Sequence, residues 1–559
     1  MEQTVHLRVT DARSGRTLPC RLHIRDAYGQ TRVPLGYLDD PKTEPAQEVG
    51  GHLVQEGKVW VYTDGSCEVR LPPGQVWVEA WHGPLYAPMS LNMDRGLGKI
   101  ALRVQLPRLL DPAPGWYWCD TRAHFLPAAA AALEGAAEGL DLVHVLAARW
   151  DEPHLPRLAQ VLEFSGQSVL LERYGCAVCV NTYQRGGPWG DLALLYCHRL
   201  VFPLTAGEPG FEHYTLADWC NQCHRKGGLV IWTAFPGVMG ERLPLALLGQ
   251  IDALEWCATA PWDDHALQLW YALLNAGCSI PLVGASGKTS NMVALGTMRT
   301  ATWLGVNKPL TLADWVRAVQ HGHTYVTAGP ILHWQVNDVA QVWQLIPRSA
   351  QSTPEASDVG PTRQADENST AGSEARSDYR LVARAESVLP FTQLELISGG
   401  EVIATATVAP VPSRTRVGSD KPSSLYGSQT PAKNTAASDH SREATVGSPA
   451  SVQILSVPLY QAELSFTCGA DHLSELPSGW LALRCWNGDR LVAHTSALKL
   501  PRRPTLRDQD RRYLEDALAQ AETTIRTTPH VRQRDLLQRL EEARRTLQKR
   551  LEVHSRDGS

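Results

Sequence analysis

Three residues at the end of one strand-like run have the types and the spacing to act together. In the stretch CDTRAHF, Asp120, Arg122 and His124 follow the apolar run GWYWC at intervals of two. Because successive side chains of a strand point to opposite faces, this spacing predicts that all three share one face. A carboxylate and an imidazole are metal-ligand types, whereas a guanidinium carries a fixed positive charge and cannot ligate a cation. The stretch therefore predicts a polar site at a strand end.

A second polar stretch, ASGKTSN at residues 285–291, follows another apolar run. Lys288 and Ser290 are its candidates for an anion or substrate pocket. The alternative interpretation is a polar loop that caps the following helix. The stretch lacks the first glycine of a phosphate-binding loop at the required spacing, which argues against nucleotide binding.

Cysteine spacing suggests two further sites, and the context disfavours both. Cys220, Cys223 and His224 spell CNQCH, the c-type haem attachment pattern, but they lie within a predicted helix and haem attachment normally needs export. Pairing them with Cys176 and Cys179 would suggest a zinc site. Residues three apart on a strand point to opposite faces, however, so CAVC does not present both thiols to one metal.

Tryptophan is abundant, and 12 of the 18 lie between Trp116 and Trp334. On a concave face such rings can stack on sugars or aromatic ligands. Most of them fall within apolar runs, where core packing is the better explanation. Trp189 in GGPWGD and Trp262 in APWDD lie in loop-like contexts, so these two are the candidate ligand contacts.

The elements that would position these residues change along the chain. Residues 1–110 contain short alternating strands and turn pairs such as Asp64–Gly65, which predict a β-sandwich. Residues 115–330 alternate apolar runs with helical stretches, one of which begins after Thr215 and stops at Gly227–Gly228. This alternation predicts a parallel sheet or a β/α barrel, with chemistry at the carboxyl ends of the strands.

Residues 331–500 predict a second, C-terminal β domain, interrupted by low-complexity stretches at 348–377 and 410–448. Neither stretch has enough apolar surface to offset its ordering entropy, so we expect two disordered insertions. Residues 505–552 are charged and helical in pattern around Pro529, which predicts a helical hairpin. We favour a structural role for the hairpin over a partner-binding one. The predicted fold class is thus multidomain α/β plus all-β.

The site-bearing segments resemble a known family. A D-x-H-x-H stretch at a strand end is the metal-binding opening of the polymerase-and-histidinol-phosphatase (PHP) superfamily, and here Arg122 replaces its first His. The later matching segments are VNTYQRGGPWGDLALL, CHRKGGLVIWTAFP, IDALEW, LLNAGCSIPLVGASGKTSN and HGHTYVTAGPILHWQVND. In this order they are similar to CehA/McbA-type metallohydrolases over most of residues 4–345. SGWLALRCW and LVAHTSAL suggest that the resemblance resumes later.

The resemblance implies a PHP-like distorted β/α barrel with a metal site of His and carboxylate ligands. A metal-bound hydroxide would then hydrolyse esters, amide-like bonds or phosphoesters. Matched residue by residue, most expected ligand positions hold another residue type: Arg122, Ala147 and Ala148, Tyr183 or Gln184, Asp191 for a His, Ala234, and Ser286 or Gly287. The ligand candidates that the resemblance leaves are Asp120, His124, Asp191 and Glu255.

This reduced set could hold one divalent ion, of zinc, manganese or magnesium. Zinc needs about three protein ligands and an open position, and the harder ions accept carboxylates and waters. Arg122, however, would place a fixed charge in the site, and Ala234 offers no ligand. We therefore favour no metal, and expect Arg122 to pair with Asp120 or Asp191 in its place.

Composition sets the remaining expectations. The chain has 559 residues and a net charge of −5, which argues against nucleic acid as a partner. It has no run of about 18 apolar residues, so we expect no membrane span. The N-terminus lacks an apolar signal core, which predicts a cytoplasmic location with the 12 cysteines as reduced thiols.

The leading hypothesis is a CehA/McbA-like homologue with an eroded metal site. It would bind a small molecule or a protein, or serve as a scaffold, without catalysis. The candidate substrate-binding residues are Arg122, Lys288, Ser290, Trp189 and Trp262. The alternative is a metal-dependent hydrolase of esters or phosphoesters that uses the reduced carboxylate and His set.

Overall fold

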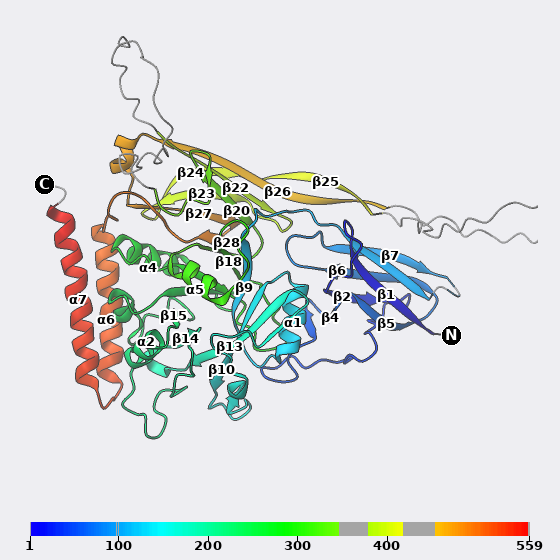
Figure 1. Ribbon diagram of the computed structural model, residues 1–559, viewed down its shortest axis with the longest axis horizontal. Helices are drawn as coiled ribbons and strands as arrows, with labels where there is room; N and C mark the ends of the chain where they lie inside the picture. Colours follow the sequence, from blue (N-terminus) through cyan, green and yellow to red (C-terminus); the bar gives the residue numbers. More distant parts are fainter. Residues whose placement is uncertain (1, 97, 99, 346–377, 418–452, 557–559) are drawn as a thin grey trace, which may run out of the picture.

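The computed structural model describes residues 2–96, 98, 100–345, 378–417 and 453–556. These residues form a mixed α/β, multidomain protein with four β-sheets. The long axis runs from the N-terminal sheets at one end to α6 (Asp508–Thr527) and α7 (Gln533–Arg556) at the other (Figure 1). No helix of the described chain is long and apolar enough to cross a membrane.

The N-terminal part packs two sheets around an apolar core. One sheet has the order β5 (Ser66–Leu71), β1 (Gln3–Asp11), β8 (Ala101–Leu106), and the other has the order β3 (His52–Gln55), β4 (Lys58–Thr63), β2 (Cys20–Arg25), β6 (Gly74–Trp81), β7 (Met89–Arg95). The alternating pattern of β1 places Val5, Leu7 and Val9 inside. Val457 of strand β26 (Gln453–Cys468) joins this cluster, so a ribbon from the far end of the sequence completes the N-terminal core (Figure 1).

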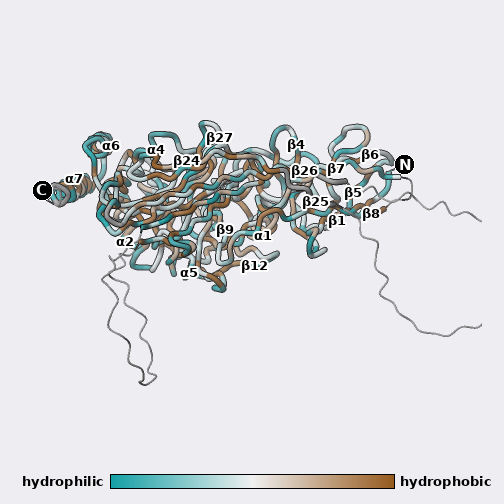
Figure 2. The backbone as a smooth tube through the Cα atoms, turned by 90° about the horizontal axis from the view of Figure 1, so that it is seen from above, coloured by the Kyte–Doolittle hydropathy of each residue, from teal (hydrophilic) through white to brown (hydrophobic). Residues whose placement is uncertain are grey.

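The largest sheet occupies the centre of the molecule. Its order is β17 (Leu282–Ala285), β16 (Ala253–Cys257), β15 (Leu229–Trp232), β14 (Leu192–Leu195), β13 (Cys176–Gln184), β10 (Leu142–Arg149), β9 (Trp116–Ala123), β18 (Arg299–Trp303), β19 (Thr324–Thr327), β28 (Arg490–Thr495), β27 (Trp480–Asn487), β23 (Gln393–Ser398), β24 (Glu401–Thr407). Three short strands pair beside this path: β11 (Leu158–Ala159), β12 (Leu171–Arg173) and β29 (Leu498–Lys499). Apolar stretches follow the central strands and polar stretches mark the connecting loops (Figure 2).

One half of this sheet curls back on itself. Strands β9, β10, β13, β15, β16 and β17 run in one direction, and β14 runs against them. The first strand, β9, approaches the last strand, β17. The Thr121 hydroxyl donates to the Gly284 carbonyl at 3.0 Å, and the His124 amide donates to the Lys288 carbonyl at 2.8 Å. The described residues form only an isolated bridge here, Ala123 with Lys288, so no continuous ladder closes the ring.

Helices cover the central sheet. They are α1 (Ala128–Ala137), α2 (Leu216–Arg225), α3 (Arg242–Leu247), α4 (Asp264–Asn275) and α5 (Leu312–Gln320). The helix predicted after Thr215 is confirmed as α2, and the Thr215 amide donates to the Asp218 carboxylate at 2.8 Å. Helices α6 and α7 pack on α3 and α4, and Leu518 and Leu540 are fully buried there. The apolar stripe of the hairpin is therefore covered by this chain itself.

The C-terminal strands divide between two sheets. The fourth sheet has the order β21 (Val339–Ala340), β20 (Ile331–Val336), β22 (Tyr379–Ser387), β26, β25 (Ala409–Val417). The other strands extend the central sheet, because β28 pairs with β19, so hydrogen bonds cross the predicted boundary at residue 330. The predicted insertion 348–377 lies outside the described residues. The prediction for 410–448 is wrong at 410–417, which pair with β26 in β25, and 418–448 lie outside the described residues.

Candidate functional site

The carboxyl ends of the parallel strands meet at one edge of the curled sheet. Arg122 is at the end of β9, Tyr183 near the end of β13, and Ala234 just after β15. Glu255 lies on β16 and contacts Arg122 at the end of β9 and Ala234 just after β15. The positions of the strand ends in the sequence thus predict which segments converge. The chemistry of this edge depends on the side chains that these segments carry.

The centre of this edge is a buried ion pair between Arg122 and Glu255. The guanidinium is bidentate: Nε and Nη2 each donate to a different carboxylate oxygen of Glu255 at 2.8 Å. Only 10% of the Arg122 side chain and 1% of the Glu255 side chain are exposed. Burial lowers the pKa of Arg122, but Glu255, with smaller contributions from Cys257 and Tyr183, outweighs this effect and raises the pKa well above its usual value. Arg122 therefore does not pair with Asp120 or Asp191, the two partners expected from the sequence.

Three smaller contacts complete the surroundings of the pair. Arg122 Nη2 also donates to Cys257 Sγ at 3.1 Å, and Cys257 Sγ lies 3.0 Å from the Thr259 hydroxyl. The Ala234 amide donates to Glu255 Oε1 at 3.2 Å. The residue at the position of an expected His ligand therefore contributes a backbone hydrogen bond to the carboxylate.

Asp120 does not share a site with Arg122. The pairing of β9 with β10 steps from Asp120–Val143 to Ala123–Val145, so three residues of β9 pass two of β10. This bulge breaks the period of two on which the shared-face prediction depends. The Asp120 carboxylate is fully buried and accepts from three backbone amides, those of Arg122 at 3.2 Å, Ser286 at 3.0 Å and Gly296 at 2.8 Å. The Asp120 carboxylate therefore links β9 to the segments that contain Ser286 and Gly296.

His124 is buried among aromatic rings. Its ring centroid lies 5.1 Å from that of Tyr183 and 5.2 Å from that of Trp150. Nδ1 is 3.3 Å from the Leu146 carbonyl, and Nε2 has no hydrogen-bond partner. Burial and the neighbouring Arg122 charge lower the pKa of His124 to about 3, so the imidazole is neutral at physiological pH.

Asp191 belongs to a third local network. Its carboxylate accepts from the Tyr183 hydroxyl and from the Gly186 amide, both at 2.9 Å. Arg242 lies nearby with 7% exposure, donates to the Thr233 carbonyl at 3.0 Å, and has an unpartnered Nε. Burial lowers the pKa of Arg242, and the charge of Asp191 partly offsets this effect.

The four candidate metal ligands do not form one donor set. Glu255 is held by Arg122, and Asp120 and Asp191 are held by the amide and hydroxyl donors just described. His124 has a free ring nitrogen without a converging carboxylate. Within the described part of the chain, no group of three or more His, Cys, Asp or Glu side chains is placed to hold a metal ion. This donor chemistry does not fit the metal centre that the resemblance implies.

Lys288 and Ser290 point into the protein. The Lys288 side chain is fully buried, and its Nζ lies 3.3 Å from Glu134 Oε2 and donates to the Val293 carbonyl at 2.8 Å. The Ser290 hydroxyl accepts from the Met292 amide at 3.2 Å. The loop turns away from the strand ends toward α1, and so does not offer these groups to a ligand as expected.

The two loop tryptophans are also buried. Trp189 is 5% exposed and its ring lies 5.3 Å from that of His530 in the connection between α6 and α7. Trp262 is 7% exposed and stacks on Trp256 at 5.6 Å. Both rings pack within the core rather than lining a concave face.

Sequence reasoning missed a hollow beside the strand ends. It has a volume of about 510 Å³ and is lined by Asp151, Glu152, Pro153, Arg185, Gly186, Gly187, Pro188, Thr205 and Ala206. Arg185 pairs with Glu152 in two hydrogen bonds, at 2.8 and 3.0 Å, and lies 4.8 Å over the Trp150 ring. The available signal was their position near strand ends, since Trp150 directly follows β10 and Arg185 directly follows β13.

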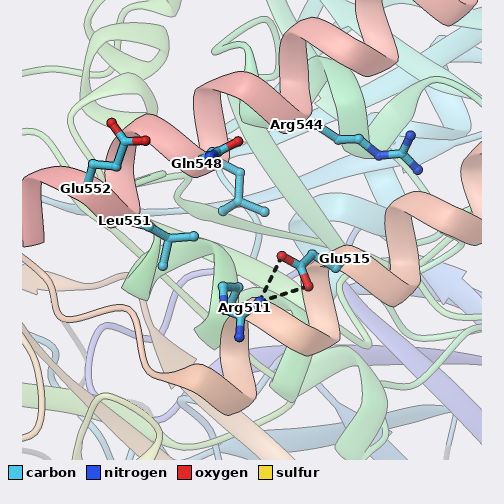
Figure 3. Close-up of a pocket in the computed structure, with 7 residues that line it drawn as sticks. Arg511, Glu515, Arg544, Gln548, Leu551 and Glu552 are labelled. Atoms are coloured by element: carbon cyan, nitrogen blue, oxygen red, sulfur yellow. Dashed lines mark hydrogen bonds and ion pairs between the residues drawn. The ribbon is translucent and has the colours of Figure 1, made fainter. Parts of the chain in front are cut away.

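A second hollow lies between α6 and α7, far from the strand ends (Figure 3). Its sides carry Arg511, which pairs with Glu515 at 3.1 Å, and Gln548 of the facing helix. Leu547 and Leu551 are its apolar residues.

Comparisons with known proteins add little. No protein-family model matches the chain, and no curated protein matches it. Among solved structures, PsfC from Pseudomonas syringae PB-5123 is similar with a TM-score of 0.26 and 18% identity, over 37% of this chain and 90% of that chain. This likeness is too low to support a conclusion about fold or function.

Proposed function

We propose that the chain is a PHP-like, CehA/McbA-like protein with an eroded metal site, which binds a ligand or acts as a scaffold without catalysis. The observation that carries the proposal is the bidentate Arg122–Glu255 pair. Both oxygens of the carboxylate that would ligate a metal accept from a guanidinium. Because arginine does not lose its proton in proteins, the guanidinium stays charged at every physiological pH.

The curled half of the central sheet supports a PHP-like barrel. Six parallel strands and one antiparallel strand follow each other around it, and helices cover its outside. The hydrogen bonds from Thr121 and His124 to the segment around β17 bring the first and the last strand together. A distorted barrel, in which a few contacts rather than a ladder join the first and last strands, would account for this arrangement.

The hollow beside Arg185 supports ligand binding. It opens at the carboxyl edge of the strands and is lined by a paired cation and anion, the Thr205 hydroxyl and glycine backbone. Such a lining suits a small polar molecule that can both donate and accept hydrogen bonds.

The proposal is tested by metal content and turnover of the purified full-length chain. The protein is incubated with Mn²⁺ or Zn²⁺, dialysed, and assayed by elemental analysis, and then with a phosphoester and a carboxylester. We expect far less than one ion per chain, and turnover equal to that of Glu255→Gln.

The double variant Arg122→His/Ala234→His is the matched control, because it restores two imidazoles where the resemblance expects them. We expect it to retain more metal than the wild type. If the wild type instead holds about one ion per chain, and Glu255→Gln loses both the ion and a measured turnover, the alternative of a metal-dependent hydrolase is correct.

A further inference from the structure

Two cysteines outside the strand-end site have their sulfurs in contact. Cys197 lies just beyond β14, and Cys223 lies in the last turns of α2, which packs beside β14 (Figure 1). Their Sγ atoms are 3.4 Å apart, and both residues are buried, at 1% and 0% exposure. A Cβ at position 228 would overlap both sulfurs, so Gly228 makes the room in which they meet.

The neighbouring cysteines are arranged differently. Cys220 lies on the same helix and is equally buried, but no hydrogen bond from its thiol to another cysteine is found among the described residues. Cys176 and Cys179 face separate clusters on opposite sides of their strand. All twelve cysteines are free thiols. Cys197 and Cys223 are thus singled out by geometry, and Cys220 is the natural control.

We propose that Cys197 and Cys223 are a site of reversible oxidation, at which hydrogen peroxide joins the two thiols in a disulfide. In the first step one thiolate attacks peroxide, is oxidised to a sulfenic acid, and hydroxide leaves and takes up a proton as water. In the second step the other thiol attacks this sulfur, and its S–H proton leaves with the hydroxyl as a second water. Two thiols and one peroxide therefore give one disulfide and two waters.

The bond would fasten the loop that lines the hollow beside Arg185. Residues 198–214 connect Cys197 to α2 and include Thr205 and Ala206, which line that hollow. The Arg185 amide donates to the Leu204 carbonyl and the Ala206 amide to the Arg185 carbonyl, so this loop is already paired with the strand end. A covalent link between Cys197 and Cys223 would enclose this loop together with most of α2, and would restrict the opening of the loop.

Burial controls the rate of the reaction. It raises the pKa of the Cys223 thiol well above its usual value, so little thiolate is present at neutral pH. We expect slow oxidation that accelerates by about tenfold per pH unit while the thiol remains mostly protonated.

The test is a peptide map of the native full-length protein after treatment with hydrogen peroxide. The sample is quenched, unfolded in excess N-ethylmaleimide and digested with trypsin. Cleavage after Arg185, Arg199 and Arg225 separates Cys197 from a peptide that holds Cys220 and Cys223. Fragmentation at Asn221 then assigns the linked cysteine.

We expect a link from Cys197 to Cys223 that dithiothreitol reverses, that Cys220→Ser retains and that Cys223→Ala abolishes. The wild-type map decides the matter by itself if either variant fails to fold. Complete alkylation of both cysteines after peroxide treatment, a link to Cys220, or a link that forms only in urea would overturn the proposal.

Discussion

The Arg122–Glu255 pair predicts a strong energetic coupling between two residues 133 positions apart. Arg122→Met leaves a carboxylate with 1% exposure and one remaining donor, the Ala234 amide at 3.2 Å. Removing one partner of a buried pair costs about 3–5 kcal/mol of unfolding free energy, because the other charge stays buried without compensation. Glu255→Leu should cost a similar amount, since it leaves the guanidinium without its anion.

The double variant Arg122→Met/Glu255→Leu removes both charges. We expect its unfolding free energy to lie within roughly 2 kcal/mol of the wild type, because well-packed apolar residues often replace a buried pair without loss. The pair then shows a coupling energy of at least about 4 kcal/mol in the double-mutant cycle. Urea unfolding followed by tryptophan fluorescence measures all four proteins.

The pH dependence separates charge from packing. In Arg122→Met the Glu255 carboxyl is buried without a cation, and burial raises the pKa of such a group. Protonation then removes the uncompensated charge, so the loss of stability relative to the wild type should shrink as the pH falls from 7 to 5. In Glu255→Leu the remaining arginine cannot deprotonate, and the loss should not change. Single-variant losses below about 1 kcal/mol, or losses that simply add in the double variant, would refute the reasoning.

Three further outcomes follow from the buried polar groups. Because the pKa of His124 falls from 6.5 to about 3 on folding, the stability that it provides is complete above pH 6.5 and drops by about 2 kcal/mol at pH 5. His124→Gln should remove this component from urea titrations at pH 7 and 5, whereas the exposed His154→Gln should not. Asp120→Asn replaces an acceptor of three amides and should cost about 1–3 kcal/mol in thermal unfolding, and an unchanged midpoint would contradict its fastening role. Arg539→Gln leaves Glu241, with 1% exposure, without its ion pair at 2.7 Å, and should release the C-terminal hairpin to trypsin faster than in the wild type.

Much of the candidate site is predictable from strand ends. Apolar runs mark β9, β13, β15 and β16, and parallel strands place their carboxyl ends together. The same reasoning identifies the helix after Thr215, because a threonine before an apolar periodic stretch satisfies the first free amides. Local pattern is sufficient for these features because each depends on residues close in sequence.

The ion-pair partners of Arg122 and Lys288 are not predictable from local sequence patterns. Arg122 pairs with Glu255, which lies 133 residues further along the chain, and the bulge in β9 that separates Arg122 from Asp120 has no visible signal in CDTRAHF. Lys288 turns toward Glu134 because the loop bends at Gly287, whose φ of 67° a residue with a side chain rarely adopts. Both outcomes are set by contacts across more than a hundred residues.

The ribbon that carries Val457 into the N-terminal core has a consequence for synthesis on the ribosome. Val5 and Leu7 are made well before Val457, because this member of their buried cluster comes about 350 residues after β8. At roughly 5–20 residues per second the nascent N-terminal sheets wait about 20–70 s for it. During that time the apolar surface that Val457 later covers is open to chaperones and to other nascent chains. Vectorial synthesis therefore leaves the core of the N-terminal sheets incomplete until Val457 has emerged.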